Sequence, residues 1–459
     1  MSEEMNDVQA YVDGLIARSR AAQKIFETYD QAQVDRVVKA IGKAVYDNAV
    51  ELGTMAAEET GMGTVEYKIA KNRNKPMATW WHLRNKKSVG VIKELKDEGL
   101  VLVAKPIGVV GCITPTTNPT MTPAHNGMIT LKGRNSMIVC PHPRAKKSTF
   151  KCVEYMRQAL KAVGAPEDLL ICVEKPSLEI SQAVMRSTDV CISTGGASMV
   201  KVAYASGKPA YGVGAGNNQC LVDRDVDLAV VAPKIIQGRI FDNGISCTCE
   251  QAIICPKEKV DEMAAELRKN GAYYIDNEEE AEKVRNATFI DGKFRKDVVG
   301  QSVEFIANIA GIKLPEGTRT IVVRAKGPGK MDVLGREKMF PVMALYTYDT
   351  WDEAIDIADA NLAMDGRGHS VSLHSFTDAH IKEAAMRLPV SRFLVNGIGS
   401  SGLGGAYTNG LAPTGTLGCG SWGNNSISEN LDYKHLINVS RIAYTNDNAH
   451  IPTPDEVWG

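Results

Sequence analysis

From residue 109 onward, short apolar runs typical of β-strands alternate with longer amphipathic runs typical of α-helices. The strand-like runs of the first series span residues 109–114, 136–140, 169–173 and 189–193. Helical runs lie between them at 121–132, 146–163 and 177–186. This alternation predicts right-handed βαβ units, in which helices cover both faces of a parallel sheet. Such sheets bind ligands at the carboxyl ends of their strands.

A second series of the same kind follows. Its strand-like runs span residues 251–255, 320–324, 342–348, 371–374 and 392–396, with helical runs near 260–270 and 350–360. We therefore predict an α/β fold with two doubly wound α/β domains that meet near residues 218–244.

Two further segments flank this pattern. Residues 6–61 are predicted to be helical, because apolar residues such as Val34, Val38 and Ile41 recur at helical spacing. Residues 86–106 alternate apolar and polar side chains around a Lys-Asp-Glu-Gly turn at 96–99, which predicts a β-hairpin. A long hairpin of this kind usually pairs with another chain, so we expect a partner subunit.

Composition excludes several classes of protein. The chain has 459 residues, of which 44% are hydrophobic and 23% charged, enough for a large core and two or three domains. Its net charge of −1 gives no sign of a nucleic-acid or anionic membrane surface. No signal-peptide pattern is visible at the N-terminus, and no apolar run approaches the ~18 residues of a membrane span. We expect a cytoplasmic enzyme.

The chain contains ten cysteines, most of them in apolar runs where they are typical of small buried residues in a reducing compartment. No CxxC pair is present, so we predict no metal site. Cys247 and Cys249 differ from the others, because they lie between a turn-forming Asp-Asn-Gly at 242–244 and the strand-like run 251–255. A thiol at such a junction can face an open cleft, as a catalytic cysteine must.

The sequence GVGAG at residues 212–216 is a weak dinucleotide-binding signal. The residues that follow, 217–222, are typical of a strand, whereas the fingerprint requires a helix there. We therefore do not assign a Rossmann fingerprint to it.

Seven motifs, taken in order, resemble those of the aldehyde dehydrogenase superfamily, and within it the CoA-acylating branch. They are PIGVVGCITPTTNPT (106–120), KGRN (132–135), PHPRAKKST (141–149), STGG (193–196), DNGISCTCEQ (242–251), EKMFPV (337–342) and LGCGSWGNNSISEN (417–430). The resemblance covers nearly the whole chain. It implies a cofactor-binding domain (1–85 and 107–235), a catalytic domain (236–429) and an oligomerisation element (86–106 and 430–459) that would support a homodimer or homotetramer.

The resemblance also implies the chemistry. Cys247 ends the motif NGISC at the position of the family's nucleophile, so it would attack an aldehyde and carry the acyl group as a thioester. Asn118, in TTNP, would stabilise the oxyanion together with the backbone N–H of Cys247. Cys249 would pack inward. The alternative for Asn118 is a turn residue before Pro119.

Hydrolytic members of the family carry a glutamate in a short E-L-G-G motif, and this glutamate activates the water that releases the acid. The corresponding stretch here begins with Gly212, so the acid is absent. Without a positioned base, water attacks a thioester slowly, whereas the thiol of coenzyme A is a better nucleophile. The absence therefore favours acyl transfer to CoA.

Cofactor contacts follow from the same resemblance. They are expected at Thr114, Pro115, His142, Arg144, Thr194, Gly195, Gly196, Gly214 and Glu337. Glu337 resembles the glutamate that holds the nicotinamide ribose, and a surface ion pair is its alternative. Residues 142–147, HPRAKK, are basic where NAD-preferring relatives carry an acid, so we expect NADP to be accepted and even preferred. A solvent-exposed or CoA-binding basic turn is the alternative.

The resemblance favours succinate semialdehyde as substrate, and leaves acetaldehyde, propionaldehyde and sulfoacetaldehyde open. An anionic aldehyde requires a cation in the pocket, for which Arg392 and His125 are candidates, each with a structural role as alternative. His369 matches a histidine common in the acylating branch and would contact cofactor or CoA, unless it too is structural. Two other functions remain as alternatives: a hydrolytic aldehyde dehydrogenase and a catalytically silent scaffold subunit.

Overall fold

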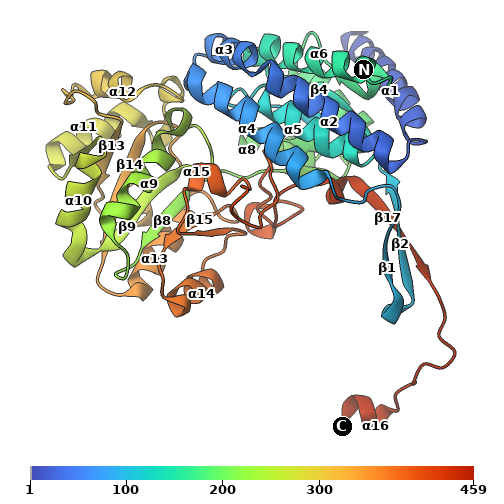
Figure 1. Ribbon diagram of the computed structural model, residues 1–459. Helices are drawn as coiled ribbons and strands as arrows, with labels where there is room; N and C mark the ends of the chain where they lie inside the picture. The colour runs from blue at the N-terminus through green and yellow to red at the C-terminus, as the bar shows by residue number, and fades with distance from the viewer. Residues whose placement is uncertain (1–2) are drawn as a thin grey trace.

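Two parallel β-sheets, one of five strands and one of seven, organise the two halves of the molecule, and helices pack on both (Figure 1). The computed structural model describes residues 3–459. It confirms the predicted α/β class with parallel sheets. Among these residues, no helix combines the length and the apolar character that crossing a membrane requires.

The five-stranded sheet and the N-terminal helices share one hydrophobic core. Across the sheet the strands are β5 (Leu170–Cys172), β4 (Ser136–Cys140), β3 (Val109–Ile113), β6 (Val190–Ser193) and β7 (Ala210–Gly212), all parallel. The helices of this half are α1 (Glu3–Phe26), α2 (Gln31–Asp47), α3 (Ala49–Thr60), α4 (Val65–Leu83), α5 (Met121–Lys132), α6 (Lys146–Ala162), α7 (Leu178–Ser187) and α8 (Ala197–Tyr204). Val34, Val38 and Ile41 of α2 are fully buried, as their helical spacing predicted.

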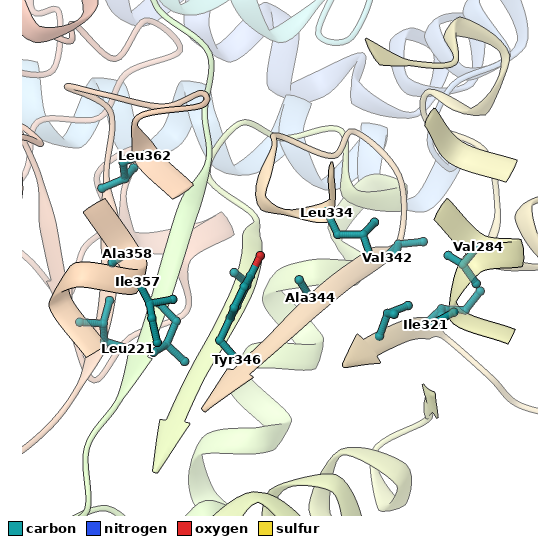
Figure 2. Packing of buried hydrophobic residues seen from close by; sticks show 14 of the residues in the cluster. Leu221, Val284, Ile321, Leu334, Val342, Ala344, Tyr346, Ile357, Ala358 and Leu362 are labelled. Atoms are coloured by element: carbon teal, nitrogen blue, oxygen red, sulfur yellow. The ribbon is translucent and has the colours of Figure 1, made fainter. Parts of the chain in front are cut away.

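The seven-stranded sheet forms the second half. Its strands, in order across the sheet, are β10 (Ala272–Ile275), β13 (Thr320–Arg324), β14 (Val342–Tyr348), β9 (Glu250–Pro256), β8 (Asn218–Val222), β15 (Val371–His374) and β16 (Phe393–Val395). The helices are α9 (Leu228–Ile240), α10 (Val260–Lys269), α11 (Glu278–Thr288), α12 (Val303–Ala310), α13 (Trp351–Leu362), α14 (Asp378–Arg387) and the short α15 (Gly399–Gly402). Figure 2 shows Leu221, Val342 and Tyr346 of this sheet among buried side chains such as Ile357 and Leu362 of α13.

The change from one sheet to the other lies earlier in the chain than the sequence-based division at 235/236. Strand β8 pairs in parallel with β9 and β15 of the seven-stranded sheet. The backbone therefore passes between the sheets in residues 213–217, within the GVGAG segment and Asn217. The strand itself was predicted, but its local sequence pattern does not specify which sheet it joins.

A three-stranded antiparallel sheet projects from the body of the molecule (Figure 1). The predicted hairpin is present as β1 (Gly90–Leu95) and β2 (Leu100–Pro106), joined by a turn in which Gly99 has φ 62°. Strand β17 (Ile437–Ala443) pairs with the other edge of β2. Beyond it, an extended segment leads to the short helix α16 (Pro454–Trp458).

The C-terminal residues also complete the core of the first half. Leu431 and Leu436 are fully buried in the same cluster as Val37 of α2 and Met128 of α5. The side-chain amide of Asn135 donates a hydrogen bond of 2.7 Å to the carbonyl of Leu436. Segments about 300 residues apart in the chain therefore share one core.

The order of the five strands contains a reversal in the direction of winding. The chain starts this sheet at β3, extends to one side through β4 and β5, and then crosses to the other side of β3 with β6 and β7. The direction of winding reverses between β3 and β6, and open α/β sheets bind ligands outside the carboxyl ends of the strands at such a point.

Candidate active site

A cavity of about 430 Å³ lies between helix α4, the turn that precedes β9, and residues 400–417. Cys247 and Asn118, which are 129 positions apart in the sequence, both line this cavity. Lys71 and Lys75 of α4 line it as well, together with the aromatic rings of Phe241 and Tyr407. The residues predicted to attack and to stabilise an oxyanion are thus brought together.

A left-handed turn presents Cys247 to the cavity. After α9 ends, Asp242, Asn243 and Gly244 all have positive φ, at 53°, 54° and 75°. The chain then turns back so that the N–H of Cys249 donates to the carbonyl of Ser246 at 3.0 Å, and β9 begins at Glu250. This conformation is unfavourable for L-residues other than glycine, so it requires support from surrounding contacts.

Cys247 differs from the other cysteines in its accessibility. It is half-buried, whereas the nine others, all free thiols, are buried. Cys249 is fully buried and its thiol points to the carbonyl of Phe241 at 3.7 Å, which confirms that it packs inward. Only the sulfur of Cys247 lines the cavity among the cysteines that the structure describes.

The segment between the sheets is in close contact with the backbone of Cys247. A Cβ added to Gly216 would come within 2.1 Å of the carbonyl oxygen of Cys247. The N–H of Gly216 donates to the Glu337 carboxyl group at 2.8 Å. Gly216 therefore lies between Glu337 and the backbone of Cys247. A glycine is therefore required where GVGAG meets the turn.

Burial governs the ionisation of both groups. Burial, with a smaller contribution from Glu337, raises the pKa of the Cys247 thiol to about 12. Burial likewise raises the pKa of Glu337 to about 8, against the opposing hydrogen bond from Gly216. At neutral pH Cys247 is therefore a thiol that must lose its proton before it can attack.

Asn118 is held by an ammonium group. The Lys71 Nζ donates to the side-chain oxygen of Asn118 at 2.8 Å. The backbone carbonyl of Asn118 accepts from the N–H of Thr122, so Asn118 also serves the turn that leads into α5. The two interpretations of Asn118 are compatible, because one uses its backbone and the other its side-chain amide.

The expected cofactor residues gather at the carboxyl ends of four neighbouring strands. Thr114 and Pro115 follow β3, His142 and Arg144 follow β4, Thr194, Gly195 and Gly196 follow β6, and Gly214 follows β7. Thr114 and Thr194 thus flank the point where the winding reverses. The residues after β6 are small, and small residues at the carboxyl end of a strand let a ligand come close to the backbone.

Three predicted substrate or CoA residues do not line the cavity. Arg392 is 2% exposed and donates to the carbonyls of Gly368, His369 and Gly418 and to Asn430. His125 and His369 are fully buried, and burial lowers the pKa of each to about 3. The contacts of Arg392 are those of a structural residue. Both histidines are neutral at neutral pH, because burial lowers their pKa.

The structure adds residues that sequence reasoning missed. Lys68, Lys71 and Lys75 recur on α4 at spacings of three and four, which predicts one helix face but not what that face meets. Glu59 of α3 was also missed, although its carboxylate accepts the N–H groups of Lys147 and Ser148, each at 2.8 Å, at the start of α6.

The cavity offers no carboxylate or imidazole that could activate water. Of the described residues that line it, none is aspartate, glutamate or histidine. At Gly212, where the resemblance implies a glutamate in hydrolytic members, an added Cβ would lie 2.5 Å from Val200 Cγ1 and 3.1 Å from the ring of Tyr204. The acid is thus absent and the local packing leaves no space for it.

Comparison with known proteins agrees with this geometry. The model of the aldehyde dehydrogenase family matches residues 4–416. The chain is 51% identical over 445 residues to the succinate-semialdehyde dehydrogenase (acetylating) of Clostridium kluyveri, which covers 97% of this chain and 98% of that protein. It is 40% identical over 451 residues to the sulfoacetaldehyde dehydrogenase of an Acholeplasma species, covering 97% and 93%.

Solved structures show the same architecture. An acetylating aldehyde dehydrogenase from Geobacillus thermoglucosidasius superimposes with a TM-score of 0.93 at 34% identity, covering 99% of this chain and 100% of that one. A propionaldehyde dehydrogenase from Rhodopseudomonas palustris, solved with bound CoA and an acylated cysteine, gives a TM-score of 0.85 at 28% identity, covering 94% and 97%.

The contact at Gly216 predicts that Gly216→Ala disturbs the cysteine turn. The added Cβ cannot fit against the Cys247 carbonyl, so we expect a loss of about 1–3 kcal/mol in stability and an altered rate of Cys247 alkylation by iodoacetamide. Thermal unfolding and mass spectrometry of the alkylated protein measure both. Gly14→Ala is the control: its Cβ would meet no atom within 4 Å, so its melting temperature should be unchanged or slightly raised. Equal behaviour of the two variants would contradict the prediction.

Proposed function

This chain belongs to the aldehyde dehydrogenase family, within which it is a CoA-acylating enzyme, and we propose that its aldehyde is succinate semialdehyde. The reaction converts the aldehyde, CoA and NAD(P)+ into succinyl-CoA, NAD(P)H and a proton. The nicotinamide cofactor supplies the acceptor for the hydride that leaves the aldehyde carbon.

The residues around the cavity support a thioester route. The Cys247 thiol releases its proton to solvent, and the sulfur attacks the aldehyde carbon. The side-chain amide of Asn118 and the Cys247 N–H donate to the oxygen that becomes negative. Loss of hydride leaves a thioester on Cys247. The CoA thiol then takes the acyl group and frees the cysteine. Water does not compete well, because no carboxylate or imidazole lines the cavity to act as its base.

Lys75 is the observation that carries the choice of aldehyde. Its Nζ donates to the Gly404 carbonyl at 2.9 Å, which leaves two N–H groups for a ligand in the cavity that contains Cys247. Succinate semialdehyde carries a carboxylate that this ammonium can bind, whereas acetaldehyde and propionaldehyde carry no charge. Arg392 and His125, the cations expected from the sequence, are occupied or neutral. The 51% identity to the Clostridium kluyveri enzyme supports the same choice.

Sulfoacetaldehyde is the second candidate. Its sulfonate is also an anion, so Lys75 favours it over the uncharged aldehydes, and a relative named for this substrate is 40% identical to the chain. The larger identity to the succinate-semialdehyde enzyme decides the order in which we place the two.

We propose that NADP is accepted as well as NAD. His142 and Arg144 are exposed just beyond the end of β4, where a cation can bind the 2′-phosphate of NADP. The Glu59 carboxylate already occupies N–H groups at the start of α6, so the phosphate would bind Arg144 rather than the helix N-terminus.

We also propose that residues 86–106 and 430–459 join subunits into a dimer or tetramer. The projecting sheet of β1, β2 and β17 and the exposed Tyr444, Ile451 and Trp458 support this role. Ten free cysteines favour a reducing compartment such as the cytoplasm.

A direct assay tests the reaction. With succinate semialdehyde and NADP or NAD, formation of reduced cofactor should require CoA, and Cys247→Ser should abolish it whereas Cys249→Ser should keep most of it. Absorbance at the reduced-cofactor band and mass spectrometry of succinyl-CoA measure the outcome. Equal rates without CoA would instead indicate hydrolysis, and no turnover with any aldehyde would indicate a silent subunit.

Replacement of Lys75 tests the substrate. Lys75→Met should lower kcat/KM for succinate semialdehyde about 10- to 100-fold and change propionaldehyde little, because only the former loses a charged contact. Lys75→Arg should retain most of the preference. A uniform loss for both aldehydes would contradict the assignment and point to a role for Lys75 in proton transfer.

The same contact predicts a pH effect. Burial lowers the pKa of Lys75 to about 8, so its ammonium is present below that pH and is lost above it. The ratio of KM for succinate semialdehyde to KM for propionaldehyde should therefore rise as the pH increases from 7 to 9. In Lys75→Arg, which stays charged, the ratio should stay flat. A flat ratio in the unmodified enzyme would contradict the assignment.

Cofactor preference can be tested at two residues of opposite charge. Arg144→Ala should raise KM for NADP about tenfold with little effect on NAD, because a charged hydrogen bond to the 2′-phosphate is lost. Glu59→Gln should shift kcat/KM toward NADP, because a negative charge is removed. A hundredfold preference of the unmodified enzyme for NAD would refute the proposal.

A further inference from the structure

Three charged side chains are buried together behind the cavity. Asp242 is fully buried, and its Oδ2 accepts from Lys71 at 2.5 Å and from Lys68 at 2.9 Å. The two lysines are only 9% and 2% exposed. Its other oxygen, Oδ1, accepts the backbone N–H of Thr64 at 3.0 Å. Burying such groups carries a large desolvation penalty unless each one is paired.

The cluster has one positive charge more than it can neutralise internally. A second donor of each lysine points to the same short segment: Lys68 donates to the carbonyl of Thr117 at 2.6 Å, and Lys71 to the side-chain oxygen of Asn118 at 2.8 Å. The surplus charge is therefore directed at the residue that faces the reacting aldehyde in the proposed function.

The contact from Lys71 fixes which end of the Asn118 amide faces the ammonium. An ammonium can only donate, so it must meet the amide oxygen, and the NH₂ group is then turned away from it. Among the residues described, the NH₂ group has one contact, a long one of 3.5 Å to Thr117 Oγ1. Its hydrogens are thus free for a ligand in the cavity, and the adjacent positive charge makes them stronger donors.

The carboxylate of Asp242 links this amide to the nucleophile. Asp242 is the first of the three left-handed residues in the turn that ends at Cys247. Its Oδ1 lies so close to helix α4 that a Cβ added to Gly63 would be only 1.9 Å away. One buried carboxylate therefore holds both the cysteine turn and the lysine that orients Asn118.

We propose that Lys71 is a positioning residue that holds Asn118 with its NH₂ group toward the developing oxyanion, and that Asp242 keeps Lys71 in place. This inference rests on the proposed thioester chemistry at Cys247. Without Lys71 the amide can rotate and present its oxygen, which repels the oxyanion.

A double-mutant cycle tests this role. Lys71→Met should lower kcat by about 10²- to 10³-fold, the effect of losing one oxyanion donor, and change KM little. In an Asn118→Ala background the same replacement should lower kcat no more than about threefold, because the group it orients is already gone. Lys71→Arg, which can donate to the same oxygen, should restore part of the rate.

Lys68→Met is the matched control. It removes a lysine of the same cluster that contacts Asp242 and a backbone carbonyl but not the Asn118 side chain. Any loss it causes should be the same with and without Asn118. If Lys71→Met does not fold, as judged by circular dichroism and thermal unfolding, Lys71→Gln enters the cycle in its place.

Equal losses from the Lys71 replacement in both backgrounds, or an unchanged rate in the single variant, would overturn the inference. An unmodified enzyme without CoA-dependent turnover would instead overturn the proposed function, so the two failures are distinguishable.

Discussion

The buried carboxylate of Asp242 joins two of the parts of the chain that make the site. It accepts hydrogen bonds from helix α4 through Lys68 and Lys71, and it belongs to the turn that presents Cys247. The left-handed backbone of this turn is unfavourable by itself. It persists because removing either the carboxylate or the lysines would leave an unpaired charge in the protein interior, which is strongly destabilising.

Close contacts at two glycines also support the turn that carries Cys247. Gly63 leaves space for the Asp242 carboxylate, and Gly216 leaves space for the Cys247 carbonyl. Gly216 also donates to Glu337, a carboxyl group whose pKa is raised. Gly216, in the segment between the two sheets, therefore contacts both Cys247 and Glu337. The location of the site at the junction of the two sheets follows from this arrangement.

The sequence predicted the elements well, because strand and helix periods are local properties. Residues 109–113 and 136–140 were recognised as strands, and the hairpin at 86–106 was recognised from its turn. The sheet to which Asn218–Val222 belongs was not predictable, because all five residues are buried and a local strand pattern does not specify the neighbouring strands.

For the candidate site too, local motifs were predictable from the sequence and tertiary contacts were not. Motif resemblance pointed to Cys247 and Asn118, and the fold brings both to one cavity. The cation was expected at Arg392, four of whose five N–H groups donate to backbone carbonyls and to Asn430. Lys75, which lines the cavity, lies on a helix from the other half of the molecule. Contacts of this kind depend on tertiary packing, which a pattern along one segment does not contain.

The burial of Leu431 and Leu436 in the first core has a consequence for the order of events during biosynthesis. The N-terminal 212 residues, which contain every strand of the five-stranded sheet, leave the ribosome long before these two leucines are made. Until then the nascent first half exposes the apolar surface that they later cover, and the edge of β2 lacks its neighbour β17. During synthesis, the core of the first half is therefore complete only after Leu431 and Leu436 have been added. Binding by chaperones would protect the exposed apolar surface until then.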